Sequence, residues 1–168
     1  MQIHIATSTG KGPTTLAAFD AALNGSGIAN YNLLRLSSVI PPATEIVVHQ
    51  GAIPNAVMPG TWGDRLYVVM AEQRTHVTHE EAWAGIGWVQ EMSTGKGLFV
   101  EHEGGSEAAV RSDIQDSLEA LMKTRGVDFG EIHMVVQGVT CEHEPVCAMA
   151  VAVYQASDWA NAAMLIEG

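Results

Sequence analysis

The chain has 168 residues, 47% of them hydrophobic, and a net charge of −11 that arises from 19 acidic against 8 basic residues. This length suits one domain with a substantial core. The shortage of cations argues against binding to a nucleic-acid backbone. No apolar run approaches the roughly 20 residues of a membrane helix, and the N-terminus lacks the pattern of a signal peptide. We therefore expect a cytoplasmic protein that does not contact membranes.

The first forty residues are predicted to form a strand, a helix and an extended segment. Alternating polarity indicates a strand at Gln2–Thr7, followed by a glycine-rich turn at Ser8–Gly12. A helix is predicted to end at the turn residues Asn24–Gly27. The helix is indicated by hydrophobic residues at helical spacing after Pro13, namely Leu16, Phe19, Ala22 and Leu23. Ile28–Ile40 is typical of extended chain.

The middle of the chain is predicted to contain two strands and a helix. Glu45–His49 and Arg65–Ala71 have the composition of strands. Thr78 and Glu81 have the spacing of a capping box, which predicts a helix at Ala82–Gln90. Two glycines inside that segment oppose a helix.

The last third is predicted to form a strand, a long helix and two more strands. The strand covers Gly97–His102, and Ser106 is placed to cap a helix that ends near Lys123. Glu131–Val139 and Val146–Tyr154 have β composition and are expected to pair as a hairpin. Strands mixed with helices in this order favour an α+β fold over a regular βαβ array.

Two adjacent serines, Ser37 and Ser38, interrupt the apolar run that ends at Pro41 and Pro42. Hydroxyls inside a strand are normally hydrogen-bonded or chemically used. On the residues alone, the pair is typical of a turn at the end of a strand. A chemical role is the alternative.

The segment NLLRLSSVIPP, residues 32–42, resembles the processing segment of the pyruvoyl-dependent arginine decarboxylase family. Three further stretches resemble the family in the same order, at residues 15–23, 27–30 and 97–104, and the likeness extends from about Thr7 to Tyr154. The resemblance implies a single domain over residues 1–168, built as a four-layer αββα sandwich. It also implies a homotrimer or hexamer whose active sites lie between subunits. The segment Ser157–Gly168 has no counterpart in the family pattern.

The resemblance implies that the chain cuts itself between Ser37 and Ser38 and so becomes the two chains 1–37 and 38–168. The Ser38 hydroxyl would attack the carbonyl of Ser37, and elimination and hydrolysis would leave a covalent pyruvoyl group at position 38. That group would serve as the electron sink for decarboxylation. Neither pyridoxal phosphate nor a metal is then required.

The family also implies roles for individual residues. Glu101 would be the proton donor, with a pKa raised by burial, and Asn32 would assist processing. Asp20 would bind the substrate guanidinium through paired hydrogen bonds. The remaining residues expected to line the substrate site are Leu16, Ala29, Tyr31, Ser37 and Val39. The bulk of Tyr31 departs from the family pattern and bears on substrate choice.

The reaction implied is the conversion of L-arginine to agmatine and CO2, as in polyamine biosynthesis. Two alternatives are the same chemistry on another amino acid, and an unprocessed homologue that binds small molecules. Ser8–Gly12 lacks the Ser or Thr that follows the lysine of a phosphate-binding loop. Cys141 and Cys147 have poor spacing for zinc, and His76 and His79 are explained equally well by the predicted helix start.

Overall fold

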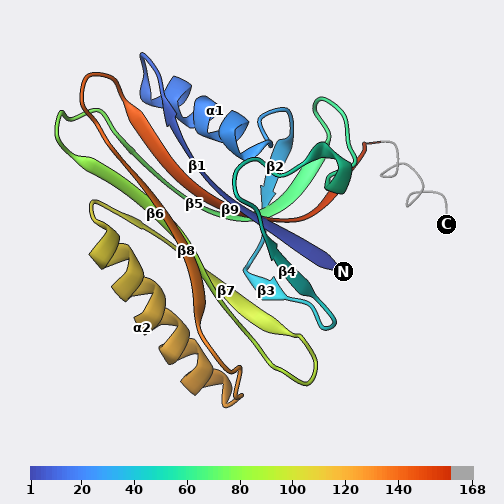
Figure 1. Cartoon of the computed structure of the whole chain (residues 1–168). Helices are drawn as coiled ribbons and strands as arrows, with labels where there is room; N and C mark the ends of the chain where they lie inside the picture. The colour runs from blue at the N-terminus through green and yellow to red at the C-terminus, as the bar shows by residue number, and fades with distance from the viewer. Residues whose placement is uncertain (160–168) are drawn as a thin grey trace.

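The computed structural model describes residues 1–159. Two β-sheets and two α-helices form the body of this part of the chain (Figure 1). The five-stranded sheet contains, in spatial order, β2 (Asn32–Arg35), β5 (Arg65–Thr75), β9 (Val146–Ser157), β1 (Gln2–Lys11) and β4 (Glu45–Val48). The four-stranded sheet contains β3 (Val39–Ile40), β7 (Gly97–Gly104), β6 (Glu81–Gln90) and β8 (His133–Thr140). The α-helices are α1 (Thr15–Ser26) and α2 (Glu107–Arg125), and a short 3₁₀ turn, η1 (Asn55–Val57), precedes β5. The α+β fold class is confirmed. No helix within residues 1–159 has the length and apolarity needed to cross a membrane.

The hydrophobic side chains form clusters that hold these elements together. One cluster joins the two sheets and includes Ile5, Ile86 and Phe99. Helix α1 packs on the five-stranded sheet through Ala18 and Ala22, and α2 packs on the four-stranded sheet (Figure 1). The face of α2 that is buried there consists of Val110, Ile114 and Leu118.

The predicted turn at Ser8–Gly12 is wrong as far as Lys11, because strand β1 includes these residues, and helix α1 lies close against them. A Cβ on Gly10 would come within 2.1 Å of the carbonyl oxygen of Ala18, so only glycine fits beneath the helix. Strand β1 therefore continues through Lys11 and pairs with β9. The helix ends as predicted, since Gly27 closes α1 in the left-handed conformation with φ of 84°, but it begins at Thr15, after Thr14 as its N-cap.

The predicted helix at Ala82–Gln90 is wrong, because this segment forms strand β6. It pairs with β7 on one side and β8 on the other. Gly85 and Gly87 point toward α2, where added Cβ atoms would lie 2.9 and 2.2 Å from side-chain atoms of Ile114. Glycines two residues apart thus indicate a strand face on which a helix packs closely. As a sequence signal for the conformation of this segment, they are a better guide than the apparent capping box.

The predicted hairpin between the last two strands is also wrong. Strand β8 pairs with β6 in the four-stranded sheet, whereas β9 lies between β5 and β1 in the five-stranded sheet. The connection between β8 and β9 therefore crosses from one sheet to the other. The long helix is confirmed as α2, with the Ser106 hydroxyl accepting a hydrogen bond from the backbone N–H of Ala109.

Replacing Gly87 with Ala should destabilise the protein, because the new methyl would overlap Ile114 at 2.2 Å. Overpacking of this kind costs about 1–3 kcal/mol, which would lower the midpoint of urea unfolding. Gly104→Ala is the matched control, since its methyl would meet only Val110, at 3.5 Å. Equal stability of the two variants would show that the close packing of α2 on β6 is wrong.

Candidate active site

The hydroxyl of Ser38 donates a hydrogen bond to Oε1 of Glu101 over 2.6 Å. The carbonyl oxygen of Ser38 accepts a second bond, 2.8 Å long, from the backbone N–H of Phe99. Both partners belong to β7, which pairs with the two-residue strand β3 directly after Ser38. The pairing of β3 with β7 therefore brings together two residues that sequence analysis singled out separately.

Ser38 has a φ of 65°, in the left-handed region that non-glycine residues rarely adopt. Such a conformation costs on the order of 1–3 kcal/mol and persists only where surrounding contacts enforce it. Ser38 is held in this conformation by its two hydrogen bonds with β7, one donated to Glu101 and one accepted from Phe99. The predicted cleavage point, the peptide bond between Ser37 and Ser38, is therefore followed by a residue with a strained backbone. Ser37, which precedes the bond, is exposed.

Burial raises the pKa of Glu101, as the sequence predicted. The Ser38 hydrogen bond and the nearby His102 and Arg35 oppose this rise, and the negative charge of Glu103 adds to it. Burial outweighs the opposing interactions, so Glu101 holds a proton at higher pH than an exposed carboxyl does. A carboxyl of this kind is suited to proton transfer.

Tyr154 is a neighbour of this site that sequence reasoning missed. Its hydroxyl donates a 3.0 Å hydrogen bond to the carbonyl oxygen of Val39, and its ring meets Phe99 edge-on. Burial raises the pKa of Tyr154, and the negative charge of Glu101 raises it further. The side chain thus links β9 of one sheet to the residue that follows the serine pair. In the sequence, only the β composition of the segment Val146–Tyr154 marked this position.

Two of the hollows near the serine pair are lined in part by Glu101 or Tyr154. One, of about 400 Å³, is lined by Phe99, Val100, Glu101, His102, Ser117, Ala120 and Leu121. The other, of about 410 Å³, is lined by Met1, Leu36, Pro41, Tyr67, Tyr154, Gln155 and Ser157. His102, in the first hollow, is hydrogen-bonded to Ser117 of α2 over 2.8 Å. Val39, which follows the pair, is exposed.

Asn32 and Tyr31 lie at the other end of the segment that leads to Ser38. Asn32 begins β2, and its side-chain amide donates to the carbonyl oxygen of Gly63 over 2.6 Å. The Tyr31 hydroxyl donates to the carbonyl oxygen of Met58 over 2.9 Å. Strand β2 extends from Asn32 to Arg35 and Ser38 lies beyond its end. Because a strand advances about 3.3 Å per residue, the side chains of Tyr31 and Asn32 are separated from Ser38 within one chain. Ala29 is half-buried in the turn that precedes them.

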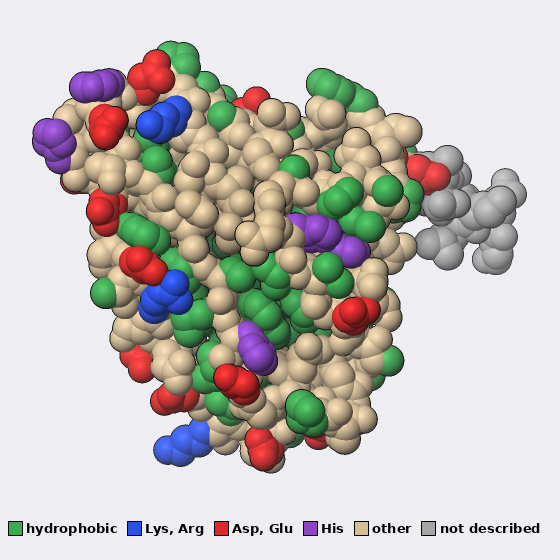
Figure 2. All heavy atoms as spheres, in the orientation of Figure 1, with side chains coloured by type: hydrophobic (Ala, Val, Ile, Leu, Met, Phe, Trp, Pro, Cys, Tyr) green, Lys and Arg blue, Asp and Glu red, His purple; other side chains and the backbone are tan. Residues whose placement is uncertain are grey.

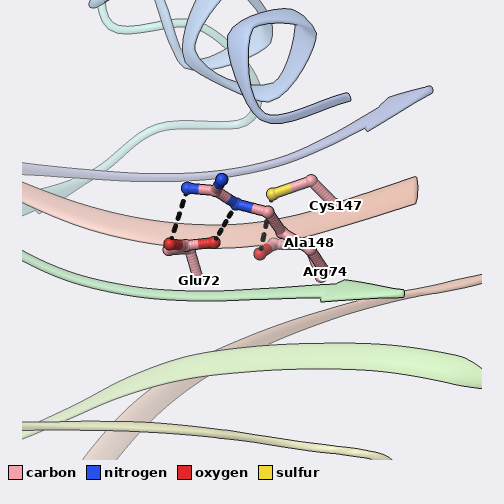
Figure 3. Close-up of polar contacts among 4 residues, drawn as sticks. All are labelled: Glu72, Arg74, Cys147 and Ala148. Carbon is pink, nitrogen blue, oxygen red and sulfur yellow. Dashed lines mark hydrogen bonds and ion pairs between the residues drawn. The ribbon is translucent and has the colours of Figure 1, made fainter. Parts of the chain in front are cut away.

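Asp20 and Leu16 are exposed on helix α1, over the five-stranded sheet, and not beside Ser38. Next to Asp20, the ring of Phe19 lies 4.0 Å from the Arg74 guanidinium. Arg74 also makes two hydrogen bonds to Glu72, of 2.8 and 2.9 Å (Figure 3). Within residues 1–159 the Asp20 carboxylate makes no ion pair.

The cysteines have the environment of core residues. Both are free and buried, and burial raises the pKa of Cys147 to about 12. The Cys147 thiol points to the carbonyl oxygen of Ala148 at 3.5 Å (Figure 3). Its thiolate form is therefore scarce at neutral pH. Across residues 1–159, no three His, Cys, Asp or Glu side chains are grouped so that they could hold a metal ion.

Comparison with known proteins identifies the family. The family model described as pyruvoyl-dependent arginine decarboxylase matches residues 2–159. A pyruvoyl-dependent arginine decarboxylase of Halobacterium salinarum is 33% identical over 162 residues, covering 94% of this chain and 96% of the relative. Relatives of the same name from Thermococcus kodakarensis and Methanococcus vannielii are 30% and 29% identical. The first alignment covers 89% of this chain and 91% of the relative, and the second covers 89% and 87%. The chain belongs to the pyruvoyl-dependent arginine decarboxylase family.

Proposed function

We propose that this chain is a cytoplasmic proenzyme that cleaves itself between Ser37 and Ser38 and then converts L-arginine to agmatine and CO2. The observation that carries the proposal is the 2.6 Å hydrogen bond between the hydroxyl of Ser38 and the half-buried carboxyl of Glu101. It joins a serine hydroxyl, which can be converted to a pyruvoyl group, to an acid suited to proton transfer. The family match supports the decarboxylase activity and arginine as the substrate.

The only reactant that self-cleavage takes up from outside the chain is water. The Ser38 oxygen forms a bond to the carbonyl carbon of Ser37, and the peptide C–N bond breaks to give an ester and a free amine at position 38. Loss of the Ser38 α-proton expels the Ser37 carboxylate and leaves dehydroalanine. Addition of water and release of ammonia then give the pyruvoyl group. The strained φ of Ser38 and its hydrogen bonds to β7 support this route, since they hold the hydroxyl in place.

The pyruvoyl carbonyl supplies an electron sink that accepts the electrons left when CO2 departs. The role we assign to Glu101 is to return a proton to the substrate carbon. Its half-buried position and raised pKa support this assignment, because the donor must hold a proton near neutral pH. Conversion of Ser38 also removes a hydrogen bond that lowers this pKa, so the mature site should hold the proton more firmly than the proenzyme does.

The substrate site in this proposal is completed by a second copy of the chain. Asp20 would bind the arginine guanidinium with Leu16, Ala29 and Tyr31 beside it, and Asn32 would act on the cleavage point of a neighbouring copy. The separation of Asp20 and Asn32 from Ser38 within one chain favours this arrangement.

Exposed hydrophobic side chains support assembly. Leu34, Leu36 and Val39 are exposed around the serine pair. Figure 2 also shows hydrophobic side chains in a hollow across the middle of one face. We propose a homotrimer, or a hexamer of two trimers, in which each protomer is a four-layer αββα sandwich. Assembly would cover surfaces of this kind.

Replacement of Ser38 by Ala should abolish self-cleavage, because alanine has no oxygen to attack the Ser37 carbonyl. On a denaturing gel the wild type should give two fragments, residues 1–37 and 38–168, and Ser38→Ala one full-length chain. Ser37→Ala is the control, since the attack requires only the carbonyl of that residue, and it should still cleave. A Ser38→Ala protein that splits at this bond would contradict the mechanism.

Glu101→Gln should cleave itself but lose turnover by roughly 10²–10⁴-fold, the usual contribution of a positioned acid or base. The glutamine amide oxygen can still accept the Ser38 hydrogen bond, but it cannot deliver a proton. For the wild type, turnover should fall as pH rises through the raised pKa of Glu101, because the protonated form is the donor. Glu103→Gln, two residues along the same strand face and exposed, should keep turnover. Full activity in Glu101→Gln would remove it from this role.

Asp20→Asn should raise the KM for arginine by about ten- to a hundredfold, because a hydrogen bond between charged groups contributes roughly 1.5–3 kcal/mol. CO2 release from arginine, ornithine, aspartate and glutamate measures substrate choice, and the wild type should prefer arginine. Asp113→Asn, an exposed aspartate on α2, is the control and should leave KM unchanged. An unaltered KM in Asp20→Asn would leave the guanidinium site unassigned.

A further inference from the structure

The ends of three neighbouring strands lie side by side where β2 begins. Asn32 of β2 is in register with Arg65 of β5, and Arg65 is in register with Ser157 of β9. Residues 158 and 159, which follow β9, therefore leave the sheet at the same end as Asn32, with β5 between them. The family match extends to residue 159, so the expectation that Ser157–Gly168 has no counterpart in the family is wrong for residues 157–159, and residues 160–168 lie outside the described part of the chain.

The carbonyl oxygen of Gly63 accepts hydrogen bonds from two side chains. The Asn32 amide donates over 2.6 Å, and the indole N–H of Trp159 donates over 2.9 Å. A carbonyl oxygen has two lone pairs, so each donor occupies one of them. Gly63 itself is fixed, because its N–H donates to the carbonyl oxygen of Asn30 over 2.8 Å and its φ of 86° suits only glycine.

Two contacts from Arg65 hold Trp159 in this position. The Arg65 guanidinium lies 4.7 Å from the centroid of the Trp159 ring, which is within the range of a cation–π interaction. The same guanidinium donates a hydrogen bond to the carbonyl oxygen of Asp158. Although Trp159 is 58% exposed, its ring is thus held on one side by Arg65 and at its N–H by Gly63.

We propose that Trp159 is a positioning residue for self-cleavage that acts through Asn32. With the indole N–H on one lone pair of the Gly63 oxygen, the Asn32 amide is restricted to the other and so to one orientation. Without Trp159, the Asn32 amide can use either lone pair. A smaller fraction of the molecules then has this amide in the orientation that assists cleavage. The inference rests on the processing role proposed above for Asn32.

Trp159→Phe tests the proposal, because phenylalanine keeps an aromatic ring for Arg65 but has no N–H for Gly63. Self-cleavage is followed after cell-free synthesis, as the first-order loss of full-length chain on a denaturing gel. Cleavage should be about three- to tenfold slower than in the wild type, the effect of one ordinary hydrogen bond. A Trp159→Phe protein that cleaves at the wild-type rate would overturn the proposal.

Trp62→Phe is the matched control. Trp62 lies in the turn that precedes Gly63 and is 83% exposed, and its N–H has no hydrogen-bond partner within residues 1–159. The same change of residue should therefore leave the cleavage rate unaltered. Equal slowing in both variants would overturn the proposal, since it would not depend on the bond to Gly63. Thermal unfolding of both variants establishes that each is folded.

Combination with Asn32→Ala tests whether Trp159 acts through Asn32. In that background Trp159→Phe should cause no further slowing, because the group being oriented is gone. Further slowing by the full factor would overturn the route through Asn32. If Asn32→Ala stops cleavage completely, the comparison of Trp159→Phe with Trp62→Phe decides the inference. A wild type that never cleaves would instead refute the proposed function.

Discussion

The hydrogen bond between Ser38 and Glu101 joins residues that are 63 positions apart in the chain. It exists because the two-residue strand β3 pairs with β7 and places Ser38 against the edge of that strand. The Phe99 N–H fixes the Ser38 carbonyl, and the left-handed φ of Ser38 aims its side chain at Glu101. If β3 did not pair with β7, the serine pair would be an ordinary exposed turn.

The surroundings of this bond determine what Glu101 can do. Burial raises its pKa, while the Ser38 hydroxyl, His102 and Arg35 lower it. The Glu101 carboxyl therefore accepts a hydrogen bond from the serine hydroxyl and can also hold a proton. Its pKa depends on whether the Ser38 hydroxyl is present, because that hydrogen bond lowers it. Tyr154 adds a second link between the sheets at the same place, through the carbonyl oxygen of Val39.

Sequence reasoning recovered the parts of the fold that depend on local signals. The boundaries of α2 follow from the Ser106 cap and its hydrophobic spacing, and the strand around Glu101 follows from its composition. It failed at β6, where Gly85 and Gly87 are required by the packing of a helix more than twenty residues away in the chain. It also failed at the end of β8, because strand composition does not say which sheet a strand joins.

Some residues of the candidate site were predicted from the sequence and others were not, because long-range contacts leave no local signal. Ser38 and Glu101 were found through family motifs, and the structure brings them into contact. The contacts of Tyr154 and Trp159 were not predicted, since each side chain donates a hydrogen bond to a carbonyl that is distant in sequence. No motif encodes such a contact. Asn32 and Asp20 were picked out by resemblance, but their distance from Ser38 within one chain could be learned only from the fold.

The most direct test of this account is the intact mass of the purified, assembled wild-type protein, together with sequencing from its N-termini. The account predicts two chains, one ending at Ser37 and one beginning at position 38 with a blocked terminus that carries a ketone in place of the serine amine. A single full-length chain, or a second chain with a free serine at its start, would contradict it.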